Sequence, residues 1–496
     1  MTEKSKMKMQ DTFIPSPVTT QKRAYALDAL RGFAILAMVL SGTIAYRILP
    51  AWMYHAQEPP PTHTFNPHLP GLTWVDLVFP LFLFSMGAAI PLALSRRLAK
   101  GLARSKIILS ILKRGFLLGT FAIVLQHLRP QVINPDPTPQ TWWIALLGFL
   151  ILFLMFVRWP DSWPIGLCRV ITLGAWGSAV ILLACLRYPD GIAGGGFSVY
   201  RSDIILIVLT NTAIFGSIVW LFTQSNLLLR LGCLGLLLAL RLSATTSGWV
   251  AWLWSASEKS NPMSFSWIFH FEYLPYLFLV IPGTIAGDLI LSWIETPTVS
   301  GNAQTYWSKR HFYSIIMFVF TICLTLLIGL QARLVWQTTL LSLTLCLAGY
   351  FLFIKPATST ERLLNNLYLW GVYWLSLGLL FEPYQGGIKK DSPTMSYFFV
   401  TAGMALFSLI AFTIIIDVLN QKKWVQLLID NGQNPMIAYV GFANLLWPIL
   451  ALTNLDSTII EHTKTPLFGF LKGLVYTLIV ASIVSLFTKL KLFWRT

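Results

Sequence analysis

Charged residues are scarce in this chain. Asp, Glu, Lys and Arg together make up 11% of its 496 residues, whereas soluble domains carry about 25%. Hydrophobic residues account for 55% of the sequence, and the mean hydropathy is +0.66. The composition therefore excludes an ordinary soluble multidomain protein and predicts a polytopic membrane protein.

Cysteine is also rare, and the arrangement of the five cysteines argues against two kinds of site. All five lie in apolar runs and none forms a Cys-x-x-Cys pair, so they indicate neither a disulfide framework nor a zinc site. The sequence lacks a glycine-rich phosphate-binding loop as well. Any phosphate-bearing ligand would therefore have to be held by separate cationic side chains.

Acidic residues are outnumbered by basic ones. The chain has 36 Lys and Arg against 20 Asp and Glu, a net charge of +16. No nucleic-acid-binding motif accompanies this excess, so no nucleic acid partner is expected. Lys and Arg of membrane proteins collect in cytoplasmic loops and orient the spans. Basic clusters before the first apolar run, after the second and near the C-terminal end predict that both termini are cytoplasmic and that the loop 50–71 lies outside.

Long apolar runs make up most of the remaining sequence. A span needs about 20 residues to cross about 30 Å of hydrocarbon. Candidate runs are Leu27–Leu49, Leu72–Leu94, Ile107–Gln126, Trp142–Val157, Ile165–Leu186, Ile204–Phe222, Leu227–Leu242, Tyr273–Trp293, Phe312–Leu330, Trp336–Ile354, Leu367–Phe381, Ser396–Asp417, Pro435–Leu452 and Leu467–Leu486. Because three of them are short, we predict an all-α transmembrane helical bundle of about 11–14 spans.

The same pattern predicts the domain organisation. The first apolar run is long enough to be a span, so we do not expect a cleaved signal peptide. We expect a cytoplasmic tail over residues 1–22, a single transmembrane domain over residues 23–496, and a location in the cell inner membrane as a multi-pass protein.

The second apolar run contains an ionisable residue. Asp76 lies three residues after Thr73 and four before Pro80. A charged group inside a membrane span costs several kcal/mol unless it is paired or faces a wet cavity. We therefore expect Asp76 to take part in a functional site, paired with Thr73 or with a histidine of the preceding loop.

Three of the seven histidines, His55, His63 and His68, lie in that loop. Histidine is the side chain best suited to proton transfer near neutral pH, so the loop and Asp76 together predict a catalytic site. We expect His63 to be the base, then His68 and then His55, because Pro59–Pro61 stiffens the backbone before His63. Two alternatives stay open: solvated histidines without a role, or metal ligands, although the spacings of eight and five residues match no standard zinc pattern.

Several motifs occur in a characteristic order along the chain. They are Leu27-Asp28-Ala29-Leu30-Arg31-Gly32, the histidine loop, Gly71-Leu72-Thr73-x-x-Asp76-Leu77-Val78-Phe79-Pro80, Phe82-Leu83-Phe84-Ser85-Met86-Gly87, Glu272 with Gly283 and Gly287, Ile388-Lys389-Lys390 with Thr394, and Asn434 with Tyr439. In this order they resemble the heparan-alpha-glucosaminide N-acetyltransferase family. The region around Trp142–Trp254 departs from the family pattern and holds extra spans.

The resemblance implies acetyl transfer from cytosolic acetyl-CoA to the amine of a glucosamine across the membrane, with an active-site histidine in the first outer loop. The family's histidine position corresponds to Asn66, which lies between His63 and His68. The expected site residues are His63, His68, His55 and Asp76 for catalysis, Glu272, Lys389, Lys390 and Thr73 for the substrate, and Asp28, Arg31, Arg96, Arg97, Arg114, Asn434 and Tyr439 for acetyl-CoA. No metal is expected.

Some of these residues have simpler explanations. Asp28 and Arg31 are three residues apart, so they share a helix face and could form an ion pair that seats the helix. Lys389 and Lys390 lie in a predicted outer loop against the positive-inside trend, where they are either tolerated or face an anion. Asn434 could act as a helix cap.

The expected function is a transmembrane acetyltransferase that moves an acetyl group from cytosolic acetyl-CoA to an amino sugar or glycan on the outer side. Its expected partners are the lipid bilayer, acetyl-CoA, the acceptor and a second copy of the chain in a homodimer. A transporter of amino sugars or small oligosaccharides is the alternative. Many spans, the intramembrane Asp76 and helices broken at Pro80 and Pro91 fit a carrier too.

Overall fold

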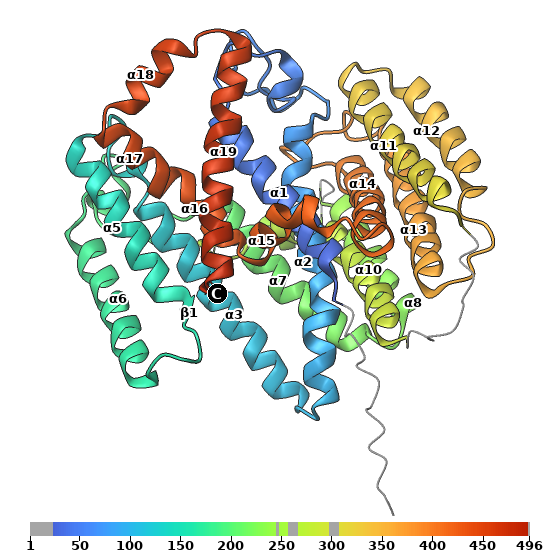
Figure 1. The fold of residues 1–496 in the computed structure, drawn as a ribbon, viewed down its shortest axis with the longest axis horizontal. Coiled ribbons are helices and arrows are strands. Elements are labelled where there is room, and N and C mark those ends of the chain that lie inside the picture. The colour runs from blue at the N-terminus through green and yellow to red at the C-terminus, as the bar shows by residue number, and fades with distance from the viewer. Residues whose placement is uncertain (1–22, 245–247, 256–265, 297–306, 495–496) are drawn as a thin grey trace, which may run out of the picture.

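The computed structural model describes residues 23–244, 248–255, 266–296 and 307–494. The predicted cytoplasmic tail, residues 1–22, lies outside the described residues. In the described part of the chain nearly all regular structure is helical, and the helices stand side by side in a bundle (Figure 1). The predicted all-α polytopic architecture is confirmed.

Twelve helical segments among the described residues are long and apolar enough to cross a membrane. They are α1 (Tyr25–Thr43), α2 (Trp74–Ala99), α3 (Arg104–His127), α5 (Pro139–Phe156), α6 (Ile165–Cys185), α7 (Ile204–Thr223), η3 (Phe271–Tyr276) with α10 (Leu277–Glu295), α11 (Lys309–Gln331), α13 (Ser359–Phe381), α14 (Met395–Thr413) with η4 (Ile414–Val418), α16 (Pro435–Gly441) with η6 (Phe442–Leu446) and α17 (Trp447–Leu452), and α19 (Pro466–Lys489). The count falls within the predicted range.

Shorter elements connect these spans. They are η1 (Ala51–Met53), α4 (Pro130–Ile133), η2 (Ile192–Gly195), α8 (Leu227–Leu242), α9 (Trp249–Ser255), α12 (Val335–Tyr350), η5 (Lys422–Val425), α15 (Gln426–Gln433), α18 (Leu455–His462) and the antiparallel two-residue strands β1 (Val157–Arg158) and β2 (Phe493–Trp494). Two of the fourteen predicted runs are thus the helices α8 and α12, of 16 residues each. At 1.5 Å per residue they reach only about 24 Å, less than the hydrocarbon thickness.

Close backbone contacts fix α2 within the bundle. A Cβ atom on Gly283 of α10 would lie 2.3 Å from the carbonyl oxygen of Phe84 in α2, and one on Gly87 would lie 2.2 Å from that of Val280. Small residues at such crossings let helices approach closely, which is how membrane helices gain packing energy. The middle of α2, two to three turns beyond Asp76, is therefore held by a tightly packed neighbour.

A similar contact joins α1 and α15, and it leads to a prediction about stability. A Cβ on Gly432 would lie 1.8 Å from the carbonyl oxygen of Asp28, so Gly432→Ala must force the two backbones apart. Overpacking a core site lowers the free energy of unfolding by about 1–3 kcal/mol. We therefore expect the melting temperature of the variant in detergent to fall by several degrees. Gly174→Ala in α6 is the control, because no atom lies within 4 Å of its added Cβ. Equal melting temperatures for the two variants would contradict this packing.

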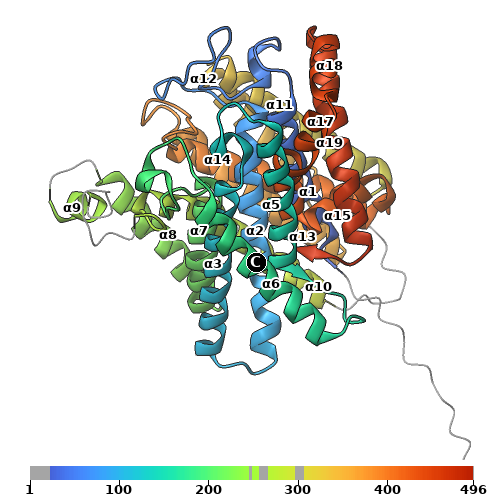
Figure 2. The same ribbon diagram turned by 90° about the vertical axis from the view of Figure 1, so that its left-hand side faces the viewer.

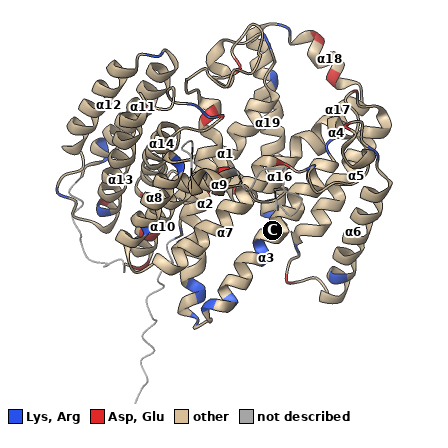
Figure 3. Ribbon diagram, turned by 180° about the vertical axis from the view of Figure 1, so that it is seen from behind, with Lys and Arg blue, Asp and Glu red and all other residues tan. Residues whose placement is uncertain are grey.

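The two ends of the bundle differ in charge. Figures 1 and 2 show α2 and α3 meeting in a hairpin at the end opposite to the loop 50–71. Lys and Arg gather at the tip of this hairpin (Figure 3), where the chain carries Arg96, Arg97, Lys100, Arg104 and Lys106. The orientation predicted from the positive-inside rule rests on these residues, and it stays a prediction, as does the cytoplasmic position of the termini.

Candidate active site

The site is built around the first turn of α2. Thr73 is the residue before the helix, and Asp76 is its third residue, so the two form a capping box. Asp76 Oδ2 accepts hydrogen bonds from the backbone N–H of Thr73 at 3.0 Å and from that of Ala56 at 3.2 Å. The side chain of Asp76 is only 2% exposed. The sequence Gly-Leu-Thr before α2 thus both starts the helix and fixes the orientation of a buried carboxylate.

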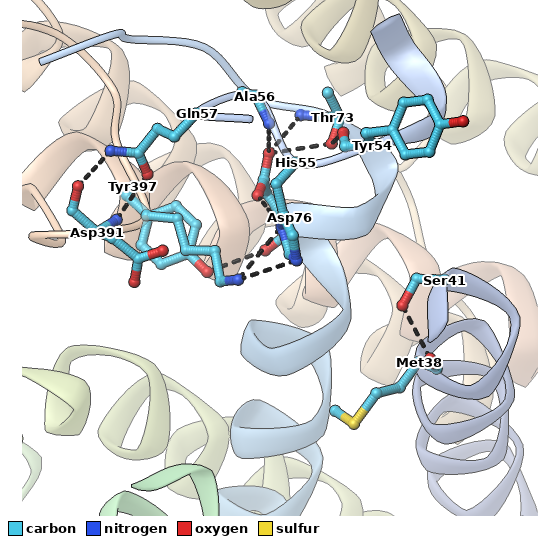
Figure 4. Close-up of polar contacts among 11 residues, drawn as sticks. Met38, Ser41, Tyr54, His55, Ala56, Gln57, Thr73, Asp76, Asp391 and Tyr397 are labelled. Carbon is cyan, nitrogen blue, oxygen red and sulfur yellow. Dashed lines mark hydrogen bonds and ion pairs between the residues drawn. The ribbon is translucent and has the colours of Figure 1, made fainter. Parts of the chain in front are cut away.

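His55 completes this arrangement. Its Nδ1 lies 2.8 Å from Asp76 Oδ1 (Figure 4). Because a carboxylate in this setting accepts hydrogen bonds, the hydrogen of the neutral ring is on Nδ1 and the lone pair is on Nε2. The imidazole is 32% exposed. The buried acid therefore does not face solvent, but the ring that it orients does, which is the geometry of a general base held by a carboxylate.

Lys390 approaches the same ring from the loop between α13 and α14. Its Nζ lies 3.2 Å from Nδ1 and 3.4 Å from Nε2 of His55. The two residues are 335 positions apart in the sequence. Of the two lysines predicted to contact substrate, only Lys390 reaches the histidine. The backbone N–H of Lys389 donates to the Thr394 hydroxyl at 3.1 Å.

Three residues that the sequence did not identify also hold the site together. Gln57 donates from Nε2 to the backbone carbonyl of Asp391, and its Oε1 accepts from the Asp391 N–H at 2.9 Å. The hydroxyl of Tyr397 in α14 donates to the backbone carbonyl of Asp76 at 2.9 Å. These contacts join the loop 50–71 to the loop 382–394 (Figure 4). No local sequence pattern marks them, because they pair side chains with the backbone of distant segments.

The other two loop histidines make no hydrogen bond to Asp76. His63, the first choice from the sequence, is 7% exposed and packs between the rings of Tyr46 and Tyr54, with centroids 4.4 and 4.6 Å away. Neither of its ring nitrogens has a hydrogen-bond partner among the described residues. His68 is exposed, and its backbone N–H donates to Asn66. The backbone N–H of His63 donates to the Pro59 carbonyl at 3.1 Å, and its ring faces aromatic rings.

The residues expected at acetyl-CoA lie in separate places. Asp28 and Arg31 form an ion pair of 3.7 Å where α1, α2 and α15 meet, and Arg31 also donates to the carbonyls of Gly432 and Ser85. Arg96 and Arg97 lie in the last turn of α2, and Arg97 donates to the hydroxyl of Ser110. Arg114 lies in α3.

Asn434 and Tyr439 bind other parts of the protein. The Asn434 amide donates to the carbonyl of Leu492 at 2.9 Å and accepts from the N–H of Trp494 at 3.0 Å, so it fixes the C-terminal strand. Asn434 does occupy the position before α16, as a helix cap would, but its side chain makes no capping bond there. The Tyr439 hydroxyl donates to Asp203 at 2.8 Å, beside Arg129.

Glu272, another predicted substrate residue, lies in η3 at the start of the segment that leads into α10. Within the described residues no hydrogen bond joins it to His55, Asp76 or Lys390. Groups of three or more potential metal ligands are likewise absent from this part of the chain. The site therefore consists of His55, Asp76 and Lys390 with their supports.

An apolar cavity lies deeper in the bundle, between α1, α2, α7 and α16. Its lining includes Ile35, Met38, Phe79 and Phe82. Phe79 is one helical turn beyond Asp76, and Ile35 is one turn beyond Arg31. The cavity measures about 10 Å³, which admits one water at most. Along α2, the cavity nevertheless lies between the His55 site and the Asp28–Arg31 pair.

Comparison with known proteins agrees with the motifs of the sequence. A family model described as a domain of unknown function, DUF5009, matches residues 23–290. Heparan-alpha-glucosaminide N-acetyltransferase from Homo sapiens is 27% identical over 206 residues, 35% of this chain and 28% of that protein. The protein of the same name from Mus musculus is 25% identical over 209 residues, 36% of this chain and 29% of that protein. The similarity thus spans less than a third of the length of these relatives.

Proposed function

This chain belongs to the DUF5009 family, and on that premise we propose that it is a membrane acyltransferase with His55 as its general base. The proposed donor is acetyl-CoA and the proposed acceptor is the amine of an amino sugar or glycan. Both come from the similarity to heparan-alpha-glucosaminide N-acetyltransferases. The observation that carries the proposal is the pair of His55 Nδ1 and the buried Asp76, 2.8 Å apart.

The pair suits acyl transfer for a specific chemical reason. An amine that attacks a thioester carbonyl forms a C–N bond, breaks the C–S bond and must lose a proton from nitrogen. With its Nδ1 hydrogen held by Asp76, His55 offers the lone pair of Nε2 for that proton. The departing thiolate takes up a proton to become the thiol. Asp76 stabilises the imidazolium that forms in between.

Distances along α2 indicate which cation could hold the donor's phosphates. Arg31 contacts Ser85, nine residues beyond Asp76, which is about 14 Å along a helix. Arg96 lies twenty residues beyond Asp76, or about 30 Å. When the thioester of the donor lies at His55, a phosphate site near Arg31 therefore fits the length of the donor better than one near Arg96. A donor that extends from Arg31 to His55 would pass the cavity lined by Met38 and Phe82. Both side chains are half-buried and would have to move.

The function is tested with purified protein, radiolabelled acetyl-CoA and glucosamine. We expect labelled N-acetylglucosamine from the wild type. In a parallel assay, vesicles that contain the protein are given labelled glucosamine without acetyl-CoA. Accumulation of sugar in the vesicles without acetyl transfer would contradict the enzyme and support a transporter.

The orientation of the chain gives a separate prediction. Thr62 is exposed in the loop 50–71, and Lys100 is exposed at the α2–α3 turn. In a background where the exposed Cys185 is replaced by Ser, we expect Thr62→Cys to react with an impermeant thiol reagent in intact cells and Lys100→Cys to be protected. The reverse pattern would overturn the proposed orientation.

A further inference from the structure

The charges around His55 create a problem for a cationic acceptor. A free sugar amine is largely an ammonium ion near neutral pH, and it must approach the Nε2 atom of His55. Lys390 Nζ already lies 3.4 Å from that atom. Two ammonium groups at the same imidazole repel each other, so a site that accepts an amine needs a carboxylate with free hydrogen-bonding capacity.

Asp76 cannot supply that carboxylate. Its Oδ1 is engaged by His55, and its Oδ2 accepts from two backbone N–H groups and lies 3.0 Å from the hydroxyl of Thr73. The side chain is also closed off from solvent, being 2% exposed. The charge of Asp76 is therefore committed to orienting the base.

Asp391 has the missing properties. It is the residue after Lys390 and is exposed. Its backbone is held by both ends of the Gln57 amide, and Gln57 is two residues after His55. Among the described residues, no hydrogen bond or ion pair occupies the Asp391 carboxylate. Figure 4 shows this carboxylate pointing away from Gln57.

The neighbours of Asp391 connect it to the rest of the site. The loop that holds Asp391 leads into α14, which carries Tyr397. Tyr397 binds the backbone of Asp76, and the ring of Tyr276 packs against Phe79 at 5.6 Å. Asp391 therefore lies in a loop that Gln57 joins to the loop of the base and that leads into the helix in contact with the backbone of Asp76.

We infer that Asp391 is the specificity residue that pairs with the ammonium group of the acceptor, and that Gln57 positions it. The inference rests on the proposed function and adds the reason why an amine is selected. After binding, the ammonium releases one proton to solvent, and the amine then loses a second to His55 as the C–N bond forms. The products are the N-acetyl sugar and the free thiol.

A binding experiment without acetyl-CoA tests the inference apart from catalysis. Glucosamine and N-acetylglucosamine differ in the charge of the nitrogen, so their dissociation constants are measured by calorimetry on the wild type and on Asp391→Asn. We expect Asp391→Asn to weaken glucosamine binding about 5-fold, the size of an exposed ion pair, and to leave N-acetylglucosamine unchanged. Added salt should weaken glucosamine binding in the wild type alone. Asp391→Glu should restore part of the preference.

Kinetics and a matched control complete the test. In acetyl transfer, Asp391→Asn should raise KM for glucosamine by a similar factor, with kcat and KM for acetyl-CoA unchanged. Asp136→Asn removes an equal charge from another exposed loop and should behave as wild type. An unchanged preference for glucosamine in Asp391→Asn would overturn the inference. Absence of acetyl transfer in the wild type, with charge-dependent glucosamine binding intact, would instead refute the proposed function.

Discussion

Replacement of His55 by alanine is expected to lower kcat for acetyl transfer by about 10²–10⁴-fold, the usual contribution of general acid–base catalysis. His55 is the loop histidine whose ring is held by Asp76 and also reaches solvent. Its loss removes the group that takes the amine proton but leaves both substrates their binding residues. KM for acetyl-CoA should therefore stay close to the wild-type value. Steady-state kinetics on the purified variant measure both quantities.

The other two histidines provide the controls. His68 is exposed and its imidazole has no contact with Asp76, so His68→Ala should retain activity. His63 is buried between two tyrosine rings, so His63→Ala should lower the melting temperature clearly and kcat only slightly. Added imidazole should restore part of the activity of His55→Ala alone. A loss of activity in His63→Ala that exceeds the loss in His55→Ala would return the catalytic role to His63, as the sequence predicted.

Asp76→Asn is expected to cause a loss of similar size through a different route. An amide presents one acceptor and one donor, whereas Asp76 accepts from His55 and from the N–H groups of Thr73 and Ala56. If the amide oxygen faces the backbone donors, its NH₂ group faces His55 Nδ1. The imidazole then carries its hydrogen on Nε2 and can no longer accept a proton there. We expect kcat to fall by about 10²–10⁴-fold.

The double variant separates this explanation from a loss of folding. If Asp76 acts only by orienting His55, the double variant His55→Ala with Asp76→Asn should be no slower than the slower single variant. Its melting temperature should match that of Asp76→Asn, because residue 76 carries the same amide, with the same backbone partners, in both variants. Multiplied effects would mean that Asp76 has a role of its own, for example in contact with a substrate.

The choice among the three histidines marks a limit of reasoning from local sequence. Prolines before His63 predicted a constrained backbone, and His63 is indeed buried. A constrained backbone does not specify what the ring faces, however, and here it faces Tyr46 and Tyr54. The partner of Asp76 is instead His55, at the start of the loop, which folds back over the first turn of α2.

Lys389 and Lys390 illustrate the same limit. The sequence identified the pair because two cations in a predicted outer loop oppose the usual distribution of charge. Only the fold separates them, by joining the backbone of Asp391 to Gln57 and thereby turning Lys390 toward His55. Asp391 had no distinguishing pattern of its own, since an isolated loop aspartate is usually just solvated.

The sequence by itself determined the features that depend on local composition. Hydropathy and length predicted the membrane helices, because each segment must satisfy its own backbone hydrogen bonds in lipid. The position of Asp76 inside an apolar run predicted a paired acid, because an unpaired charge within a membrane span is costly. Only the tertiary structure decided which side chains meet at that acid. His55 meets Lys390, and Gln57 meets Asp391, through contacts across more than 300 residues. The packing energy that closes such contacts belongs to the whole bundle and not to any one segment.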